Sequence, residues 1–316
     1  MNITTLTLNP ALDKSTSTDK LQPEQKLRCT PMHQDAGGGG INVSKGIQKL
    51  GGQSIAVFPA GGHNGQLLNE ILTEMKVETA VLPVPGETRE NISVTETSSN
   101  NQFRFTLPGI EISEKIADKC LEIIEKQRPA YLVASGSLPP GLPVTYYEKV
   151  AAFAKKINAR FILDTSGEAL SAAAGEGLYL LKPNLAELSA LAGVEKLEIN
   201  QVDDAALEII RQGKCEVVVV SLGPQGALLV TRNEMRHIPA PPVKKLSTVG
   251  AGDSMVAGMV WGLSQGQSAL EMAQLGVACG SAATLNRGTQ LFKKEDVDRL
   301  HEWIQTYGER FRRHDF

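Results

Sequence analysis

Hydrophobic positions along the chain alternate between two spacings, one typical of strands and one typical of helices. Apolar runs of strand length occupy residues 3–8, 54–59, 77–82, 131–135, 161–163, 179–181 and 216–221. Segments with helical spacing lie between them, at 42–50, 65–75, 112–127, 146–158 and 203–212. Strands that alternate with helices predict a parallel sheet with right-handed crossovers. Residues 255–264, 268–285 and 295–306 predict three further helices.

Two segments interrupt this alternation. Residues 14–35 are polar and lack helical periodicity, and residues 87–107 read as a hairpin around Ser98–Asn101. We expect both to form a small sheet that stands off the main body, where it covers a site as a lid or pairs with another subunit. The chain is therefore interpreted as a single domain, 1–316, with a lid inserted at 14–35 and 87–107.

Composition narrows the class of protein. The 316 residues are 41% hydrophobic and 21% charged, with a formal net charge of -3, which argues against a nucleic-acid binder that relies on bulk positive charge. The sequence has no apolar stretch of the roughly 18 residues that a membrane helix needs and no secretory signal pattern. Its four cysteines lie far apart without CxxC spacing, so a reduced, cytoplasmic protein is expected.

The glycine-rich stretch from Ser247 to Met255 is the first candidate for chemistry. Gly250 and Gly252 let a ligand approach the backbone where a helix is predicted to begin. Free N–H groups make such a helix start an anion site, and Asp253 places an acid beside it. From these residues alone, a plain glycine turn with Asp253 as a helix cap explains the pattern equally well.

A second glycine run, Gly37–Gly40, leads into a predicted helix that carries Asn42. It lets a polyhydroxylated ligand lie against the backbone with Asn42 bonding a hydroxyl, and a flexible hinge is the alternative. Asp13 follows the first strand and is a candidate acceptor for a substrate hydroxyl, or else a solvated turn aspartate. Arg89 and Arg104 either grip a phosphate or form ordinary surface charge.

Lys182, Asn184 and Glu187 follow the predicted strand at 179–181. Asn184 and Glu187 stand three residues apart at a helix start, which suits oxygen ligation of Mg²⁺ and equally suits a capping box. The sequence lacks GxxxxGK[ST], so an ATP user would cradle its phosphates at the Gly250–Gly252 helix start. Asp253 would take the proton from an attacking hydroxyl, and Lys182 would offset phosphate charge.

Three motifs together resemble the PfkB (ribokinase-like) carbohydrate kinases from Leu6 to about Asn286. They are Gly37-Gly38-Gly39-Gly40-Ile41-Asn42-Val43-Ser44, Thr248-Val249-Gly250-Ala251-Gly252-Asp253-Ser254, and Lys182-Pro183-Asn184-Leu185-Ala186-Glu187. Other runs, such as Thr7-Leu8-Asn9-Pro10-Ala11-Leu12-Asp13 and Ser135-Gly136-Ser137-Leu138-Pro139-Pro140-Gly141, resemble the phosphofructokinase branch and, within it, bacterial 6-phosphofructokinases. The resemblance implies an α/β fold, a ribokinase-like three-layer α/β/α sandwich with a mostly parallel central sheet and a small β-sheet lid.

The resemblance also implies a role for each site residue. Asp253 would be the base, and Gly250, Ala251 and Gly252 the anion hole. The sugar would be held by Asp13, Gly38, Gly39, Asn42 and Ser137, with Lys26, Arg89 and Arg104 around its phosphate. ATP would contact Lys182, Asn184, Ser221, Gly223, Gly226 and Thr248, with Mg²⁺ at Asn184 and Glu187. K⁺ would bind among Ser247, Val249, Ala283, Asn286, Gly288 and Gln290. Ser247 stands where more distant members have aspartate, so this cation site would lack a side-chain charge.

The activity implied is ATP-dependent phosphorylation of fructose 6-phosphate at its 1-hydroxyl, giving fructose 1,6-bisphosphate in glycolysis. Fructose 1-phosphate and tagatose 6-phosphate remain as alternative substrates, because they differ only in phosphate position or in one stereocentre. A sugar-phosphate sensor without catalysis is an alternative of another class, although the intact Asp253 and NxxE motif speak against it. We also expect a homodimer through the lid, without membrane or nucleic-acid partners.

Overall fold

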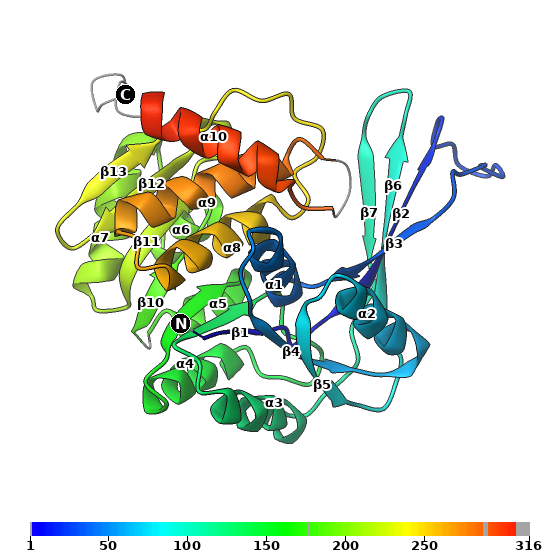
Figure 1. Ribbon diagram of the computed structural model, residues 1–316, viewed down its shortest axis with the longest axis horizontal. Coiled ribbons are helices and arrows are strands. Elements are labelled where there is room, and N and C mark those ends of the chain that lie inside the picture. Colours follow the sequence, from blue (N-terminus) through cyan, green and yellow to red (C-terminus); the bar gives the residue numbers. More distant parts are fainter. Residues whose placement is uncertain (1, 176, 287–289, 308–316) are drawn as a thin grey trace.

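The computed structural model describes residues 2–175, 177–286 and 290–307, which form a layered body with a projecting arm (Figure 1). The body is built on a nine-stranded sheet in the order β13-β12-β11-β10-β9-β8-β1-β4-β5. Its strands are β1 (Ile3–Leu6), β4 (Ile55–Ala60), β5 (Glu78–Pro83), β8 (Tyr131–Ser135), β9 (Arg160–Asp164), β10 (Leu178–Leu181), β11 (Cys215–Ser221), β12 (Ala227–Thr231) and β13 (Met235–Ile238). The strands from β5 to β11 run parallel, and β12 and β13 continue the sheet antiparallel.

Helices cover both faces of this sheet. One face carries α1 (Gly39–Lys49), α2 (Gly62–Glu74), α8 (Ala251–Ser264), α9 (Ala269–Ala283) and α10 (Lys294–Tyr307). The other carries α3 (Glu114–Gln127), α4 (Tyr146–Lys156), α5 (Gly167–Ala173), α6 (Leu185–Leu191) and α7 (Val202–Arg211). Two short 3₁₀ turns lie in connections, η1 (Ile199–Gln201) before α7 and η2 (Gly223–Gln225) between β11 and β12. No helix in the described ranges is long and apolar enough to cross a lipid bilayer.

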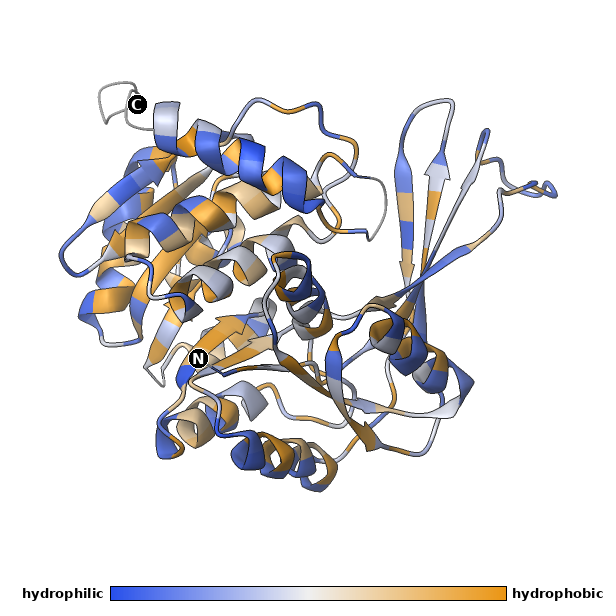
Figure 2. Cartoon of the chain, in the orientation of Figure 1, coloured by the Kyte–Doolittle hydropathy of each residue, from blue (hydrophilic) through white to orange (hydrophobic). Residues whose placement is uncertain are grey.

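The apolar runs of the sequence serve both faces of the sheet at once. In β11, Val217 and Val219 pack into the core under α8 and α9, whereas Val218 and Val220 pack into the core under α4 to α7. Successive side chains of a strand point to opposite faces, so a strand covered on both sides is apolar without interruption. Figure 2 accordingly shows hydrophobic residues concentrated in the large sheet and the helices on it.

The projecting arm is a four-stranded sheet in the order β3-β2-β6-β7. It is formed by β2 (Ala11–Thr18), β3 (His33–Gly37), β6 (Arg89–Glu96) and β7 (Gln102–Thr106). The central strands β2 and β6 pair in parallel over eight residues each. This pairing joins the two segments that interrupt the alternation of strands and helices in the sequence. The arm is mostly hydrophilic (Figure 2). We call it the lid, although whether it closes over a site stays a prediction.

The predicted fold class is confirmed, with local differences. The helix expected from residue 255 begins at Ala251, because Gly250 adopts a left-handed conformation (φ 71°) that turns the chain into the helix. Helix α5 and strand β13 were not predicted from the sequence. Both are short, at seven and four residues, and too brief to show a clear hydrophobic period.

Candidate active site

The site lies where several parallel strands end at the same edge of the large sheet. Asp164 is the last residue of β9, Lys182 directly follows β10, and Ser221 is the last residue of β11. The N-terminal parts of α1 and α8 lie close to this edge, and they carry Asn42 and Asp253. Ligands of open α/β sheets gather at the carboxyl ends of strands, so this edge is the candidate active site.

Asp253 stands in the first turn of α8, and its carboxylate accepts a hydrogen bond from Asn42. Asn42 Nδ2 donates to Asp253 Oδ2 over 2.9 Å. Burial raises the pKa of Asp253 to about 6 from its ordinary value of 3.8, with a further rise from the charge of Asp164. The hydrogen bond from Asn42 and the charge of Lys182 act in the opposite direction. A carboxyl group with this pKa is mostly deprotonated at neutral pH and can accept a proton.

The start of α8 is open to an anion. No side chain in the described part of the chain caps it at Gly250, so the first-turn N–H groups of Gly252 and Asp253 are available to a ligand. Gly252 is exposed, and a Cβ built there would lie 3.5 Å from Lys182 Nζ. The missing side chain of Gly252 therefore leaves space between the helix start and an ammonium group.

Lys182 is buried and pairs with Asp164, with 3.2 Å between Nζ and Oδ1. Burial lowers the pKa of Lys182, but the charges of Asp164, Glu187 and Asp253 outweigh this and raise it overall. The ammonium group is therefore kept charged beside the anion site. Asp164 was not among the predicted site residues. The signal in the sequence that could have found it is an acidic residue at the end of a buried strand.

The glycine run packs against protein more than against open space. A Cβ on Gly39 would collide with Ser135, and one on Gly40 would lie 2.6 Å from Thr7 Oγ1. Thr7 Oγ1 also accepts a hydrogen bond from the N–H of Ile41 (2.8 Å). These glycines therefore let α1 begin directly on the ends of β1 and β8, and that close approach places Asn42 opposite Asp253. Gly38 has a φ of 114°, which favours glycine on its own.

The predicted sugar-binding residues lie at the base of the lid. Asn91 Nδ2 donates to Asp13 Oδ1 over 2.9 Å, and burial raises the pKa of Asp13. Arg89 donates from Nη2 to the carbonyl of Asn9 (3.0 Å) and from Nη1 to that of Leu107 (3.2 Å). Asn9 Nδ2 in turn donates to Ser137 Oγ (3.1 Å), so Arg89 and Ser137 meet through Asn9.

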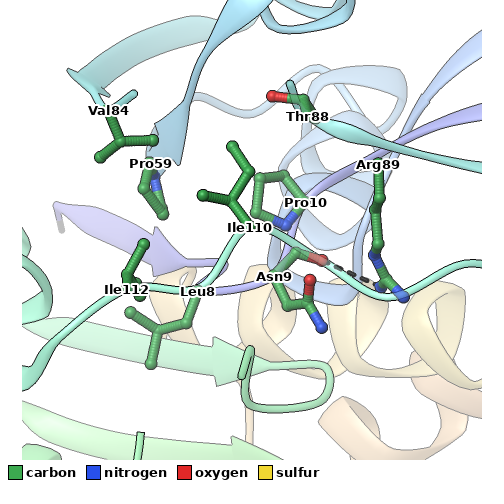
Figure 3. Close-up of a pocket in the computed structure, with 9 residues that line it drawn as sticks. All are labelled: Leu8, Asn9, Pro10, Pro59, Val84, Thr88, Arg89, Ile110 and Ile112. Carbon is green, nitrogen blue, oxygen red and sulfur yellow. Dashed lines mark hydrogen bonds between the residues drawn. The ribbon is translucent and has the colours of Figure 1, made fainter. Parts of the chain in front are cut away.

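Two hollows adjoin Arg89. The smaller one, drawn in Figure 3, lies among Leu8, Pro59, Val84, Ile110, Ile112 and their neighbours, and Arg89 reaches across to the Asn9 carbonyl at its margin. Its volume of about 10 Å³ has room for one water molecule and excludes a sugar phosphate. A wider groove of about 720 Å³ also has Asn9 and Arg89 in its wall, with Leu138 and Glu168. That groove is large enough for a sugar phosphate.

Lys26 and Arg104 lie apart from this cluster within the lid. Lys26 is exposed in the segment between β2 and β3. Arg104 is exposed on the edge strand β7, where its Nε and Nη2 donate to Gln102 Oε1 over 3.3 and 3.1 Å. In the described part of the chain neither side chain forms a hydrogen bond or ion pair with Asp13, Arg89 or Ser137, so the residues predicted to bind the phosphate do not form one cluster.

Asn184 and Glu187 form a capping box at the start of α6. Glu187 N–H donates to Asn184 Oδ1, and Asn184 N–H donates to Glu187 Oε2, each over 2.9 Å. Burial raises the pKa of Glu187. In the described residues no cluster of three or more His, Cys, Asp or Glu side chains could enclose a metal ion. One carboxylate with free acceptor capacity fits Mg²⁺ that keeps its waters and phosphate ligands, so the two interpretations of this pair are compatible.

The other predicted nucleotide contacts frame the same edge. Ser221 pairs with Asn184 through an isolated parallel bridge, and its N–H donates to the Pro183 carbonyl over 2.9 Å. Gly223 and Gly226 form the turn between β11 and β12, with φ of 60° and 96°. Thr248 is exposed just before Gly250. Gly223 is exposed and Gly226 is buried against the Ile238 carbonyl, so this hairpin turn is open to a ligand only on the Gly223 side.

The predicted K⁺ ligands come from two neighbouring segments. Ser247 N–H donates to the Thr284 carbonyl (3.3 Å), which places Ser247 and Val249 beside the end of α9 with Ala283 and Asn286. Asn286 Nδ2 donates to the carbonyls of Ala282 and Leu291, so its side-chain oxygen faces away from them. Hydroxyl, amide and carbonyl oxygens suit a monovalent cation. Gln290 is exposed, and Gly288 lies outside the described residues.

Comparison with known proteins agrees with this geometry. Residues 7–296 match the pfkB family of carbohydrate kinases. The chain is 45% identical over 306 residues to the ATP-dependent 6-phosphofructokinase isozyme 2 of Escherichia coli, covering 96% of this chain and 99% of that one. It is 34% identical over 299 residues to the 1-phosphofructokinase of Bacillus subtilis, covering 93% and 96%.

The fold agrees as well. The crystal structure of Escherichia coli phosphofructokinase-2 in complex with potassium superposes with a TM-score of 0.93 at 44% identity, covering 96% of this chain and 99% of that one. A family match over most of the chain and a full-length relative lead to the same assignment. The chain belongs to the pfkB family of carbohydrate kinases.

Proposed function

We propose that the protein is an ATP-dependent 6-phosphofructokinase, which transfers the terminal phosphoryl group of ATP to the 1-hydroxyl of fructose 6-phosphate. One observation carries the proposal. A carboxylate with a raised pKa, Asp253, stands in the first turn of an uncapped helix with the Lys182 ammonium beside it. A base and an anion hole are thereby brought within one turn of each other, which is what phosphoryl transfer to an alcohol needs.

In this mechanism Asp253 accepts the proton of the attacking hydroxyl. The backbone N–H groups at Gly252 and Asp253 stabilise charge on the transferred group, and Lys182 adds its positive charge from the other side. Asn42 holds the Asp253 carboxylate through the 2.9 Å hydrogen bond and leaves one oxygen free for the substrate. Positioning and charge stabilisation supply most of the rate enhancement in such reactions.

The nucleotide would lie along the ends of β10 and β11. Lys182, Asn184, Ser221, Gly223, Gly226 and Thr248 are the residues proposed to contact it. Asn184 and Glu187 would hold Mg²⁺ with the phosphates, and the ion would neutralise charge on the phosphoryl oxygens. The neutral oxygens of Ser247, Val249, Ala283 and Asn286 are proposed to hold K⁺, as the potassium complex of the Escherichia coli relative supports.

The sugar would lie between Asp13, Asn42 and the glycine run, with its phosphate toward Arg89 and Ser137. Lys26 and Arg104 would reach that phosphate only when the lid lies over the site. The lid also offers a surface for a second copy. Phe103 and Phe105 on its edge strand β7 are 40% and 51% exposed, and an unpaired edge with apolar side chains favours association. We therefore propose a homodimer through the lid, which light scattering at working concentration tests directly.

Two other substrates compete with fructose 6-phosphate. The higher identity to the 6-phosphofructokinase relative (45%) than to the 1-phosphofructokinase relative (34%) favours fructose 6-phosphate. The test is kcat/KM for fructose 6-phosphate, fructose 1-phosphate and tagatose 6-phosphate, measured side by side with Mg-ATP. We expect a clear preference for fructose 6-phosphate. A preference for either competitor would overturn the substrate assignment, and binding without turnover of all three would favour a sensor.

A further inference from the structure

Lys45 is a buried charged residue that the mechanism above does not use. It stands on α1, one helical turn after Asn42, and its side chain is 1% exposed. Its ammonium donates to Asp35 Oδ1 (2.8 Å), to the carbonyl of Ala36 (2.7 Å) and to Asn42 Oδ1 (3.4 Å). An ammonium group has three donors and no acceptor, so these contacts engage all three.

Asn42 thus lies between a group that only donates and a group that only accepts. Its Oδ1 faces the Lys45 ammonium, and its Nδ2 faces the Asp253 carboxylate. A side-chain amide in such a position has one orientation that satisfies both neighbours. Turning the amide over would place Nδ2 against Lys45 and Oδ1 against Asp253, and both contacts would become repulsive. The buried ammonium therefore determines which end of Asn42 meets Asp253.

We propose that Lys45 is a positioning residue, which fixes the Asn42 amide so that it donates to Asp253 and holds this carboxylate in place for proton transfer. The inference rests on the proposed function, in which Asp253 is the base. Lys45 touches none of the reacting atoms and acts through Asn42. Its counter-ion Asp35 and the Ala36 carbonyl belong to β3, so the same ammonium links the base of the lid to α1.

A buried ion pair is poor evidence for stability by itself, because desolvation offsets much of the attraction between the two charges. An apolar side chain of similar size would fill the same space in α1. The charge of Lys45 is better explained by the orientation that it imposes on Asn42. Since a hydrogen bond to a charged group is worth roughly a ten- to hundredfold change in an equilibrium, misplacing the Asn42 donor is costly for the reaction.

Several charged groups surround the contacts that link Lys45, Asn42 and Asp253. Asp253 is faced by Asp164 from β9, by Lys182 from the segment after β10 and by Asp13 from β2. Lys45 is faced by Asp35 from β3, by Asp13 from β2, and by Lys49 one turn later in its own helix. The substitutions at Asp35 and Lys45 described below leave Asp164, Lys182, Asp13 and Lys49 in place, so a change in their pH profile reports the contact of Asn42 with Asp253.

The test removes the ion pair as a unit, because Lys45→Met alone would leave the buried Asp35 charge without the Lys45 charge that offsets it. The variant Asp35→Asn/Lys45→Met keeps the volume and removes both charges. The variant Asp35→Asn keeps the Lys45 ammonium that contacts Asn42 Oδ1 (3.4 Å) and removes only the charge of its counter-ion. Lys49→Met is the matched control, since it removes a half-buried lysine from the same helix without touching Asn42. The readouts are kcat, both KM values, Tm and the pH profile of kcat.

We expect kcat of the Met variant to fall about tenfold or more, with KM for ATP unchanged. The acid limb of kcat should move to higher pH, because the Asn42 donor lowers the pKa of Asp253. The Asp35→Asn variant should keep most of the activity, because its ammonium still faces Asn42, and Lys49→Met should match the wild type. In the Asn42→Ala background, the Met variant should cause little further loss, since both changes remove the same hydrogen bond.

Several results would overturn the inference. A Met variant with wild-type kcat and pH profile but a lower Tm would show a structural role only. A loss of activity that multiplies with that of Asn42→Ala, or a folded Asp35→Asn variant no more active than the Met variant, would show that Lys45 does not act through Asn42. Wild-type protein inactive on every phosphosugar would overturn the proposed function and this inference together, whereas an active wild type with an unaffected Met variant would overturn this inference alone.

Discussion

The substitution Asp253→Asn should make the protein more stable and almost inactive. Burial raises the pKa of Asp253 to about 6 from 3.8, so the folded protein resists forming the charge that catalysis requires. An uncharged amide keeps the shape of the side chain and can still accept the hydrogen bond from Asn42 Nδ2. It removes the buried charge, and with it the base.

The size of the stability change follows from the two pKa values. At pH values above 6 a pKa of about 6 in place of 3.8 corresponds to about 3 kcal/mol of lost stability. Asp253 is partly open to the site, and solvent screening reduces this to about 1–3 kcal/mol. The sign is clear. Between pH 3.8 and 6 the folded protein holds a proton that the unfolded chain has released, so stability contributed by this group falls as pH rises.

The measurement is denaturant unfolding of wild type and Asp253→Asn from pH 4 to 8 at one fixed protein concentration. Fluorescence of Trp261 and Trp303 reports the transition. The variant's advantage should be near zero at pH 4, grow through pH 6 and stay constant above it. Its kcat should be lower by about 10² to 10⁴, the usual contribution of a general base. Asp19→Asn, an exposed change in the lid, is the control and should alter neither quantity.

Two results would refute this reasoning. Wild-type turnover by Asp253→Asn would show that Asp253 is not the base. A variant that is inactive but less stable than wild type at pH 8 would show that the Asp253 charge is favourable in the folded protein, contrary to the burial on which its raised pKa depends.

Three further predictions concern the helix start, the cation site and the lid. Gly252→Ala adds a methyl group 3.5 Å from Lys182 Nζ, so kcat should fall on the order of 100-fold with Tm retained. Gly250 has a φ of 71°, and a Cβ there would lie 2.7 Å from Leu291, so Gly250→Ala should lower the free energy of unfolding by about 1–2 kcal/mol. Ser247→Asp supplies a charge to the proposed K⁺ site, and initial rates across a KCl series should show half-activation at lower K⁺; an unchanged half-activation point would remove Ser247 from the site. Phe105→Lys, on the exposed edge of the lid, should shift the mass measured by light scattering from dimer to monomer, and a wild-type monomer would contradict the dimer proposal.

Local sequence determined the repeating architecture and the main chemical groups. The inner parallel strands of the large sheet have apolar runs because both faces of this sheet are covered, and this leaves a signal in consecutive residues such as Val217–Val220. Asp253, Asn42 and Lys182 sit in short motifs whose residue types indicate their chemistry without any knowledge of contacts. The family resemblance came from the same motifs. Boundaries were less well predicted, as at α8, because a left-handed glycine and not hydrophobicity sets its start.

Tertiary structure alone decided how these groups act on one another. Asp253 and Asn42 are 211 residues apart, and only the approach of α1 to α8 turns them into a hydrogen-bonded pair. The raised pKa of Asp253 is likewise a consequence of burial, which no local pattern encodes. The sequence does not distinguish Lys45 from other helix lysines, because its ion pair with Asp35 depends on where the lid strand β3 meets α1. The sequence by itself therefore determined which reactive groups the protein has, and the fold decided their distances and protonation, because burial and long-range contacts exist only once the chain has folded.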